Sequence, residues 1–508
     1  MSGARGEELV AFLHSDLSGL NRGRSVPLSE LDNRFAAGVG WVPADQALTP
    51  FGPIAEPNPF GSLGDLRLLP DRDTRVRVDL WEDASPLHFF LCDAVNTDGR
   101  PWDACPRTLL KGALSRLEEA GRGRLISSFE QEFILEGLSV EPGPGFSLEA
   151  QRLAEPFGPL VFAALRQASL EPEVFLPEYG EGQYEVPCAP AEGVSGADRA
   201  AAMREVVREV ARRLGYRASF VPKADPESVG NGVHIHLSLV DLEDRPVFYD
   251  PERPGRLSAV GARFAAGILA HLPALCAFTA PSVVSYLRLV PHFWSAGFGC
   301  LGERNRETAI RIPPIVELSS GDPARQFNLE FRAADAAACP HLALAVLVLA
   351  GLRGLQNELP EPTLIEEDPT GLDEEERRRL GISELPGSLD EALGALETDE
   401  IVRSWFPSEL WECYLSVKRK EIDLLEGARQ GKRASDTCAS TELLETLLGG
   451  LKEELPAAVT LRERLHASLE LGHEQRARDC RSCGAGSRCL ERNPPCSSRT
   501  ARLHHRRS

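Results

Sequence analysis

Hydrophobic positions recur along most of this chain with two different periods, and each period predicts a different element. Apolar residues three or four positions apart predict amphipathic helices around 203–214, 264–272 and 342–355. Between these helices, several short segments alternate apolar and polar residues, which is typical of strands with one face in a core. Such alternation favours an antiparallel sheet over the uniformly apolar strands of a doubly wound parallel sheet. The chain is therefore predicted to be an α+β protein.

Changes in this pattern along the chain predict four regions. Residues 8–105 alternate short apolar runs with turn signals and predict a small β-rich domain, in which the proline-rich stretch 45–59 is a loop. Helices and strands then alternate over 106–426, the expected larger domain. A charged helical extension is expected over 427–474. The last region, 475–508, is rich in arginine and cysteine and is expected to be a disordered tail.

Four cysteines in the tail offer an alternative to disorder. Cys480 and Cys483 have the spacing of many zinc ligands, but Cys489 and Cys496 do not repeat it. The neighbouring arginines and prolines favour disorder. We therefore predict a disordered tail, with a zinc site as the alternative.

Composition and charge narrow the class of protein. A chain of 508 residues with 42% hydrophobic residues can bury more than one core. Its net charge of −20 argues against a nucleic-acid partner and against an anionic membrane surface. Residues 1–10 lack the apolar segment of a signal peptide, and the apolar run 342–352 is too short to span a bilayer. The other eight cysteines are scattered, which is typical of reduced thiols, so we expect a cytoplasmic protein.

Polar residues share one face of four predicted strands, because side chains two positions apart point the same way. The segment 129–133 carries two glutamates on one face, and 233–239 carries two histidines and a serine. The segment 328–332 pairs a glutamate with an arginine. The segment 182–186 carries another glutamate, with one more just upstream. The candidate ligands on these strands are Glu130, Glu132, Glu178, Glu185, His234 and Glu330.

For any one of these strands, the alternative is a face open to solvent. Solvated faces usually carry mixed charges with lysine, threonine and serine, whereas here five glutamates and a histidine gather with hardly a lysine. Holding five carboxylates together without cations would cost several kcal/mol in repulsion and desolvation. Carboxylates with a single imidazole favour hard ions such as Mg²⁺ or Mn²⁺ over zinc. The four strands together predict a site for divalent metal ions.

Arginines recur close to the acidic strands. For each one alone, a surface salt bridge is the alternative, but as a group they suit bidentate recognition of carboxylate and phosphate. The phosphate-cradling loop of many nucleotide-binding proteins is missing, because Gly431 and Lys432 lack the required neighbours. A nucleotide would therefore be held by metals and arginines. The arginines in question are Arg288, Arg304, Arg306, Arg311 and Arg332.

These segments resemble the signature segments of glutamine synthetases in order and spacing. The resemblance covers roughly residues 8–426 and implies an N-terminal β-grasp domain followed by a catalytic domain with a curved antiparallel sheet and flanking helices. In the catalytic part it rests on segments 129–133, 178–185, 230–236, 281–291, 305–313 and 328–332. In the N-terminal part it rests on segments 16–19 and 64–71.

The resemblance also implies an activity. Members of this family are ATP-dependent carbon–nitrogen ligases: ATP phosphorylates the γ-carboxylate of glutamate, and an amine then displaces phosphate from the γ-glutamyl phosphate. It implies two or more Mg²⁺ or Mn²⁺ ions per site, with ATP as co-substrate. It further implies a homo-oligomer, a dodecamer-like ring whose active sites lie between neighbouring subunits.

Residue roles follow from the same resemblance. Glu132, Glu178 and Glu185 would bind the metal beside the amino acid, and Glu130, His234 and Glu330 the metal that orients the ATP phosphates. His236, Ser238 and Arg311 would lie at the nucleotide. Arg288 and Gly230 would hold the glutamate substrate. The catalytic arginines at the transferred phosphate would be Arg306, Arg311 and Arg332.

One position departs from glutamine-forming members of the family. Counting on from Arg288, the place of their flap glutamate is held by Trp294, whose indole cannot act as a base. Asp45 is the nearest candidate for the aspartate that usually completes the ammonium pocket. We therefore expect an organic amine, packed against Trp294, as the acceptor, with ammonia as the alternative. For Trp294 itself, the alternative is a buried packing residue at a subunit contact.

A different class of function also competes. Some members of such families lose catalysis and become structural or interaction proteins. Those proteins usually lose their metal ligands first, because a carboxylate cluster is costly without metal. All six candidate ligands are present here, so we predict an active ligase.

Overall fold

The computed structural model describes residues 6–138, 143–318 and 321–429, with side chains described up to residue 426. Residues 427–429 complete the last helix. Most of the predicted extension over 427–474, and the whole of the predicted tail with its four cysteines, lie outside the described residues. The predicted domain boundaries therefore stay predictions.

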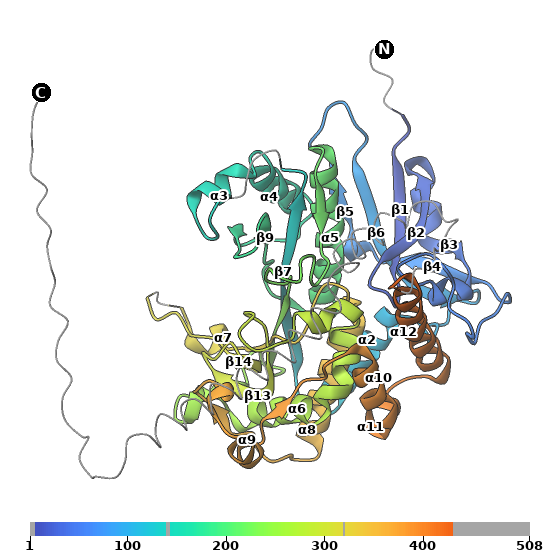
Figure 1. Ribbon diagram of the computed structural model, residues 1–508. Helices are drawn as coiled ribbons and strands as arrows, with labels where there is room; N and C mark the ends of the chain where they lie inside the picture. Colours follow the sequence, from blue (N-terminus) through green and yellow to red (C-terminus); the bar gives the residue numbers. More distant parts are fainter. Residues whose placement is uncertain (1–5, 139–142, 319–320, 430–508) are drawn as a thin grey trace, which may run out of the picture. The chain divides into compact units, whose positions relative to one another are not determined.

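The N-terminal region forms a six-stranded sheet in the order β2-β1-β6-β4-β3, with β5 also on β6 (Figure 1). Its core side chains include Phe12, Phe89 and Trp41, and β1 alternates buried and partly exposed residues as the sequence predicts. Gly19, at the β1–β2 turn, has φ +75°, and a Cβ there would lie 2.7 Å from the Ala337 carbonyl oxygen. The turn therefore packs closely against the other part of the fold. The strands are β1 (Leu9–Ser15), β2 (Asn21–Pro27), β3 (Val39–Trp41), β4 (Leu66–Pro70), β5 (Val76–Val78) and β6 (Leu87–Asn96).

The second sheet has eleven strands, in the order β16-β13-β14-β15-β12-β7-β9-β8, with β10, β11 and β17 paired off this path. The long central strands β7 and β12 pair antiparallel with each other, as predicted. At one end, β13 pairs parallel with β14 and with β16, so the sheet is mixed rather than wholly antiparallel. Alternation along a strand reports which of its faces is covered but not the direction of its neighbour.

The strands of the main path are β7 (Arg124–Glu136), β8 (Leu176–Pro177), β9 (Gln183–Glu185), β12 (Val233–Val240), β13 (Phe298–Glu303), β14 (Thr308–Ile312), β15 (Leu329–Phe331) and β16 (Leu364–Ile365). The side strands are β10 (Ala191–Glu192), β11 (Arg217–Ser219) and β17 (Ser383–Glu384).

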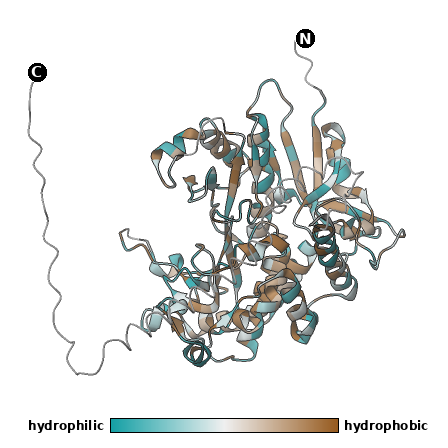
Figure 2. Ribbon diagram, in the orientation of Figure 1, coloured by the Kyte–Doolittle hydropathy of each residue, from teal (hydrophilic) through white to brown (hydrophobic). Residues whose placement is uncertain are grey.

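The three helices predicted from apolar spacing are confirmed. They lie in α5 (Ser195–Arg213), α6 (Ala259–Thr279) and α8 (Pro340–Gln356), and Leu214 caps the end of α5 rather than continuing it. Apolar residues, brown in Figure 2, run along α6 and α8, which pack together where Gly267 faces Gly354. The other long helices are α2 (Pro106–Glu119), α4 (Phe157–Gln167), α10 (Leu389–Thr398) and α12 (Ser408–Arg429). The short ones are α1 (Leu31–Ala37), α3 (Leu148–Leu153), α7 (Pro323–Gln326), α9 (Glu374–Leu380) and α11 (Glu400–Arg403).

Helix α6 is also the one helix in the described ranges that is long and apolar enough to cross a membrane. That test rests on length and composition alone, and 67% of its most apolar window is buried. It packs against α8 and α10, whose apolar residues belong to the same core. These contacts are those of a core helix in a globular protein.

A buried ionic cluster ties α2 to α5 and α8. The Arg107 guanidinium donates two hydrogen bonds of 2.9 Å to the Asp198 carboxylate and also pairs with Asp71 and Asp93. His341 Nε2 lies 2.9 Å from Asp198 Oδ1. Burial alone would raise the pKa of Asp198, but the hydrogen bonds from His341 and Arg107 outweigh burial and lower it to about 2.

We expect Asp198→Asn to lower the free energy of unfolding by about 3–5 kcal/mol, because it leaves the buried Arg107 undercompensated. A carboxyl whose pKa is depressed in the folded state stabilises the fold above its ordinary pKa of 3.8. This contribution disappears as the pH falls through about 2, and the variant should lack that part of the acid dependence. Urea unfolding at several pH values measures both effects.

The control for this prediction is Asp98→Asn, which makes the same aspartate-to-asparagine change at an exposed residue. Asp98 pairs with Arg100 at the surface, so this variant should leave stability unchanged. A loss below about 1 kcal/mol for Asp198→Asn would contradict the structural role of the cluster.

Candidate functional site

The register of the second sheet brings the predicted polar residues together. On β7, odd-numbered residues are buried and even-numbered residues face the site, as the alternation predicts. Glu130 lies directly across from His234 on β12. Glu330 on β15 lies between His236 on β12 and Arg311 on β14. At the other side of β7, Glu132 lies across from Glu185 on β9.

The side chains at these positions are close enough to share cations. His234 Nδ1 lies 3.1 Å from Glu130 Oε2 and 3.7 Å from Glu330 Oε1. His236 Nε2 lies 3.1 Å from Glu130 Oε1. Two groups have ligand atoms within 4.8 Å of one another: Glu130, Glu185 and His234, and Glu130, His236 and Glu330. We call these residues, together with Glu132 and Glu178, the acidic cluster.

The chemistry of the acidic cluster fits divalent metal ions. Burial and the charges of Glu130 and Glu132 raise the pKa of Glu185 well above its ordinary value. Burial and the charge of Glu132 raise the pKa of Glu178 to about 7. His236 Nδ1 lies 2.8 Å from Asn328 Oδ1, and its buried Nε2 faces Glu130 Oε1 at 3.1 Å. A cation would relieve the repulsion among these carboxylates.

The structure groups the candidate ligands differently from the division implied by the resemblance. It places Glu185 with Glu130 and His234, while Glu132 and Glu178 belong to neither compact group. The Glu132 carboxylate instead accepts hydrogen bonds from Gln183 Nε2 and the Gly232 N–H. The cluster is therefore continuous across the sheet, and Glu130 is common to both groups.

Two of the predicted catalytic arginines pair with Glu330. Arg311 Nη1 lies 2.6 Å and Arg332 Nη1 2.5 Å from its carboxylate oxygens. Arg332 also donates to the carbonyl oxygens of Arg306 and Trp294, both at 3.2 Å. Burial and the charges of Arg311 and Arg332 lower the pKa of Arg306. Three guanidiniums that repel one another form a place where an anion is favoured.

The two predicted glutamate-binding residues meet beside the acidic cluster. Arg288 is buried, donates to the Arg332 carbonyl oxygen at 3.2 Å, and has an Nη1 without a partner among the described residues. A Cβ at Gly232 would lie 2.5 Å from Arg288 Nη2, and one at Gly230 would lie 2.8 Å from Arg288 Cγ. A side chain at Gly230 would also meet the Pro222 carbonyl oxygen at 2.5 Å, and one at Gly232 would displace the Arg288 guanidinium from its position.

Gln183 organises this part of the site, a role that the sequence analysis missed. Its Nε2 lies 3.0 Å from oxygens of Glu132, Gly230 and Asn231. It therefore links the acidic cluster on β7 to the loop that carries Gly230. The signal in the sequence was the alternation that puts Gln183 on the same strand face as Glu185.

Two predicted residues lie apart from the acidic cluster. Ser238 follows His236 on the same face of β12 but pairs in register with Ile126, toward the end of β7. Asp45 lies in the 3₁₀ turn Pro43–Ala47 of the N-terminal region. Burial raises the pKa of Asp45, and the charged groups that act on it are Arg24 and Arg22. Within one chain, Asp45 has arginines rather than the acidic cluster as electrostatic neighbours.

Trp294 is exposed and belongs to a group of aromatic rings. Its ring stacks on Tyr179 with centroids 4.9 Å apart and planes at 21°, and Tyr179 meets Phe146 edge-on at 4.8 Å. The three residues, here called the aromatic stack, are 51%, 52% and 53% exposed. Trp294 is not buried within the chain, and its burial at a subunit contact stays the alternative. Tyr179 directly follows Glu178, so the stack borders the acidic cluster.

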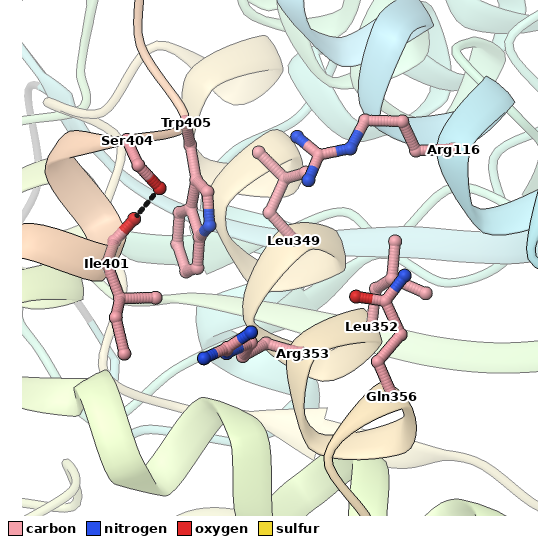
Figure 3. A pocket seen from close by; sticks show the side chains of 8 residues that line it. All are labelled: Arg116, Leu349, Leu352, Arg353, Gln356, Ile401, Ser404 and Trp405. Carbon is pink, nitrogen blue, oxygen red and sulfur yellow. Dashed lines mark hydrogen bonds between the residues drawn. The ribbon is translucent and has the colours of Figure 1, made fainter.

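A separate small cavity of about 150 Å³ lies between α2, α8 and α11 (Figure 3). Arg116, Arg353 and Trp405 are among its lining residues, and the Ser404 hydroxyl donates to the Ile401 carbonyl oxygen at 2.6 Å. Its eight lining residues include neither a carboxylate nor a histidine. It is therefore not part of the acidic cluster.

Both parts of the described fold are similar to known proteins. Residues 3–102 match the family model of the glutamine synthetase N-terminal domain, and residues 103–436 match that of the glutamine synthetase catalytic domain. Among similar proteins, the gamma-glutamylpolyamine synthetase GlnA3 of Streptomyces coelicolor is 33% identical over 82% of this chain and 90% of its own. The glutamine synthetase of Pyrococcus abyssi is 32% identical over 83% of this chain and 91% of its own.

Solved structures agree with these matches. A crystal structure of a novel glutamine synthase homolog is 48% identical with a TM-score of 0.78, covering 84% of this chain and 97% of that chain. A complex of GmaS with ADP is 25% identical with a TM-score of 0.70, covering 83% of this chain and 95% of that chain.

Proposed function

The chain belongs to the glutamine synthetase family of ATP-dependent, metal-using ligases, and from this premise we propose that it joins the γ-carboxylate of glutamate to an organic amine. The observation that carries the choice of acceptor is the aromatic stack beside the acidic cluster. Trp294 stands where the resemblance places an acidic flap residue in glutamine-forming members. An indole can pack against an alkylammonium group but cannot accept its proton.

We assign the metal ions, Mg²⁺ or Mn²⁺, to the acidic cluster. The residues that would hold two or more ions are Glu130, Glu132, Glu178, Glu185, His234 and Glu330, with His236 beside them. Bound there, the ions would neutralise charge on the ATP phosphates. Glu178 and Glu185 support this assignment, because burial and the neighbouring carboxylates raise their pKa values, whereas histidines and arginines lower the pKa values of Glu130 and Glu330.

We assign one arginine to the glutamate substrate and three to the phosphoryl group of ATP. Arg288, whose Cγ lies against Gly230 and whose Nη1 has no partner among the described residues, would grip a carboxylate of glutamate. Arg306, Arg311 and Arg332 would hold the transferred phosphoryl group, since Arg311 and Arg332 pair with Glu330 and their charges act on Arg306. A γ-carboxylate oxygen attacks the γ-phosphorus of ATP, and the bond to ADP breaks. The neutral amine then attacks the acyl carbon, phosphate leaves, and the amine nitrogen loses its proton as the amide forms.

The aromatic stack would receive the organic part of the acceptor. Half-exposed aromatic rings attract an ammonium or alkylammonium group through their faces, with a gain of about 0.5–2 kcal/mol for a contact. Trp294 and Tyr179 stack on each other, Phe146 meets Tyr179 edge-on, and each of the three side chains is about half exposed. The similarity to a gamma-glutamylpolyamine synthetase supports an acceptor with an extended chain.

The test is an acceptor screen at fixed glutamate, ATP and Mn²⁺. We expect kcat/KM for an alkylamine or polyamine, such as putrescine or spermidine, to exceed that for ammonium by at least about tenfold, which corresponds to one good ring contact. Phosphate release gives the rate, and mass spectrometry of the γ-glutamyl product confirms the bond formed. Reactions without glutamate are the control. If ammonium is the best acceptor, the proposal is wrong.

The competing function is that of a catalytically inactive structural or interaction protein of the same family. Retention of the acidic cluster with its arginines argues against it, because such a buried cluster is costly without metal. Calorimetry with Mn²⁺ and ATP separates the two functions: an inactive scaffold would bind neither.

We further propose a cytoplasmic homo-oligomer, a ring with sites between subunits. The family resemblance supports the ring. All seven cysteines in the described residues are free and buried, which supports a reducing compartment. Native mass measurement tests the oligomer.

A further inference from the structure

A cavity of about 460 Å³ lies apart from the acidic cluster. It is half open to solvent and is lined by residues of the β1–β2 turn, the end of α5, strand β11, the segment 281–284 and helix α12, among others. None of its lining residues is a candidate metal, ATP or glutamate ligand. Its volume is in the range of small-molecule sites.

The cavity has an apolar body with one unsatisfied polar group. Leu20, Phe51, Phe220 and Val284 are among the apolar side chains that line it. Ser219 also lines it and is 4% exposed, and its hydroxyl has no hydrogen-bond partner among the described residues. A buried hydroxyl without a partner is costly, so a ligand atom that bonds it would be favoured.

The charges on the lining are mostly positive in a protein of net charge −20. Arg208, Arg212, Arg217 and Lys418 contribute cations, whereas Glu421 is the one acid among the lining residues and pairs with Lys418 at 2.9 Å. Arg208 and Arg212 pair with Glu205 and Glu209 on their own helix. A guanidinium has five N–H donors, so these pairs leave donors for a second anion.

The walls of the cavity continue directly into the glutamate site. The carbonyl oxygens of Val221 and Pro222 accept hydrogen bonds of 2.7 and 2.8 Å from the side chain and main chain of Asn231, next to Gly230. The segment that carries Val284 leads, within four residues, to Arg288. A ligand that orders these walls would also order the residues that hold glutamate.

We propose that this cavity binds a small organic anion with an apolar body, and that the bound anion tightens the site for glutamate. Apolar rings would fill the space around Phe51 and Phe220, the anionic group would face Arg208 and Arg212, and Ser219 would bond a polar atom of the ligand. The site is separate from the acceptor site at the aromatic stack, so its test does not depend on which amine is used.

The probe is 8-anilinonaphthalene-1-sulfonate, and its uncharged counterpart is N-phenyl-1-naphthylamine, which has the same rings without the sulfonate. With Mg²⁺, ADP and glutamate present to fill the catalytic site of the full chain, we expect saturable fluorescence at one probe per chain. The anion should bind at least about tenfold more tightly than the uncharged compound. In steady-state assays without ADP, the anion should lower the KM for glutamate at least about threefold with little change in kcat.

Two neighbouring arginines provide a matched pair of variants. Arg212 lines the cavity, Arg213 does not, and both pair with Glu209 on α5. Arg212→Gln should weaken binding of the anion about fivefold or more, and Arg213→Gln should leave it unchanged. Equal effects of the two variants, equal binding of the two probes, or an unchanged KM for glutamate would overturn the proposal. Binding to a chain ended at Arg429 but not to the full chain would also overturn it, because residues of the same chain would then occupy the cavity.

Discussion

Glu130→Gln is expected to lower kcat by about 10³-fold or more, the largest effect of any single change proposed for this protein. Glu130 is common to both compact ligand groups of the acidic cluster, with oxygens 3.1 Å from His234 Nδ1 and 3.1 Å from His236 Nε2. The amide keeps the size of the side chain but removes the negative charge that both groups share. Both ligand groups would then bind their metal ions less tightly, and the ions would stabilise the phosphates less in the transition state.

The same variant gives a readout that does not depend on activity. Mn²⁺ should raise the thermal midpoint of the wild-type protein, because a ligand that binds the folded state stabilises it. The rise should be much smaller for Glu130→Gln. The control is Glu136→Gln, which lies on the same face of β7 and pairs weakly with Arg217 at 3.8 Å. Full activity of Glu130→Gln, or an equal loss for Glu136→Gln, would contradict the assignment of the acidic cluster.

Trp294→Ala is expected to lower kcat/KM for the preferred organic amine by about tenfold, since a ring contact with an alkylammonium group contributes about 1–2 kcal/mol. Trp294→Glu should go further and raise the rate with ammonium relative to that amine by about a hundredfold, because it adds a proton acceptor and removes the apolar face. Both effects are read from initial rates across the acceptor panel.

The kinetic constants for the other substrates serve as the internal control for these variants. Trp294 meets Arg332 through its main-chain carbonyl oxygen, which every substitution retains. The KM values for ATP and glutamate should therefore change less than about twofold. The backbone at Trp294 has φ +57°, a conformation that a substitution can disturb. A general disordering of the segment around Trp294 would instead raise the KM values for ATP, glutamate and the amine together. An unchanged acceptor preference in both variants would exclude the aromatic stack as the acceptor site.

Alternation of polar and apolar residues was enough to predict most of the acidic cluster. Because a strand places residues two apart on one face, Glu130 and Glu132 had to face away from the core that holds Phe129 and Phe133. Repulsion among so many carboxylates then indicated cations. The helices α5, α6 and α8 could also be predicted from the sequence, since their apolar residues recur at the helical period.

The same alternation does not predict how the strands pair with one another. The sequence did not specify that β13 runs parallel to β14 and β16, because alternation carries no information on the direction of a neighbour. Nor did it specify that Glu185 joins Glu130 and His234, since that grouping depends on the register of β9 and β12 against β7. Register is a property of two strands and is decided by packing over the whole sheet.

By itself, then, the sequence determined which residues are chemically unusual: the acidic strand faces, the arginines that follow them and the indole in the flap. Only the tertiary structure decided which of them touch. It placed Tyr179, with Phe146 at its edge, against Trp294 from a distant part of the chain, and it formed the cavity at Ser219 between segments far apart in the sequence. The reason is physical: local patterns follow from the geometry of one element, whereas a contact between elements follows from the packing of all of them.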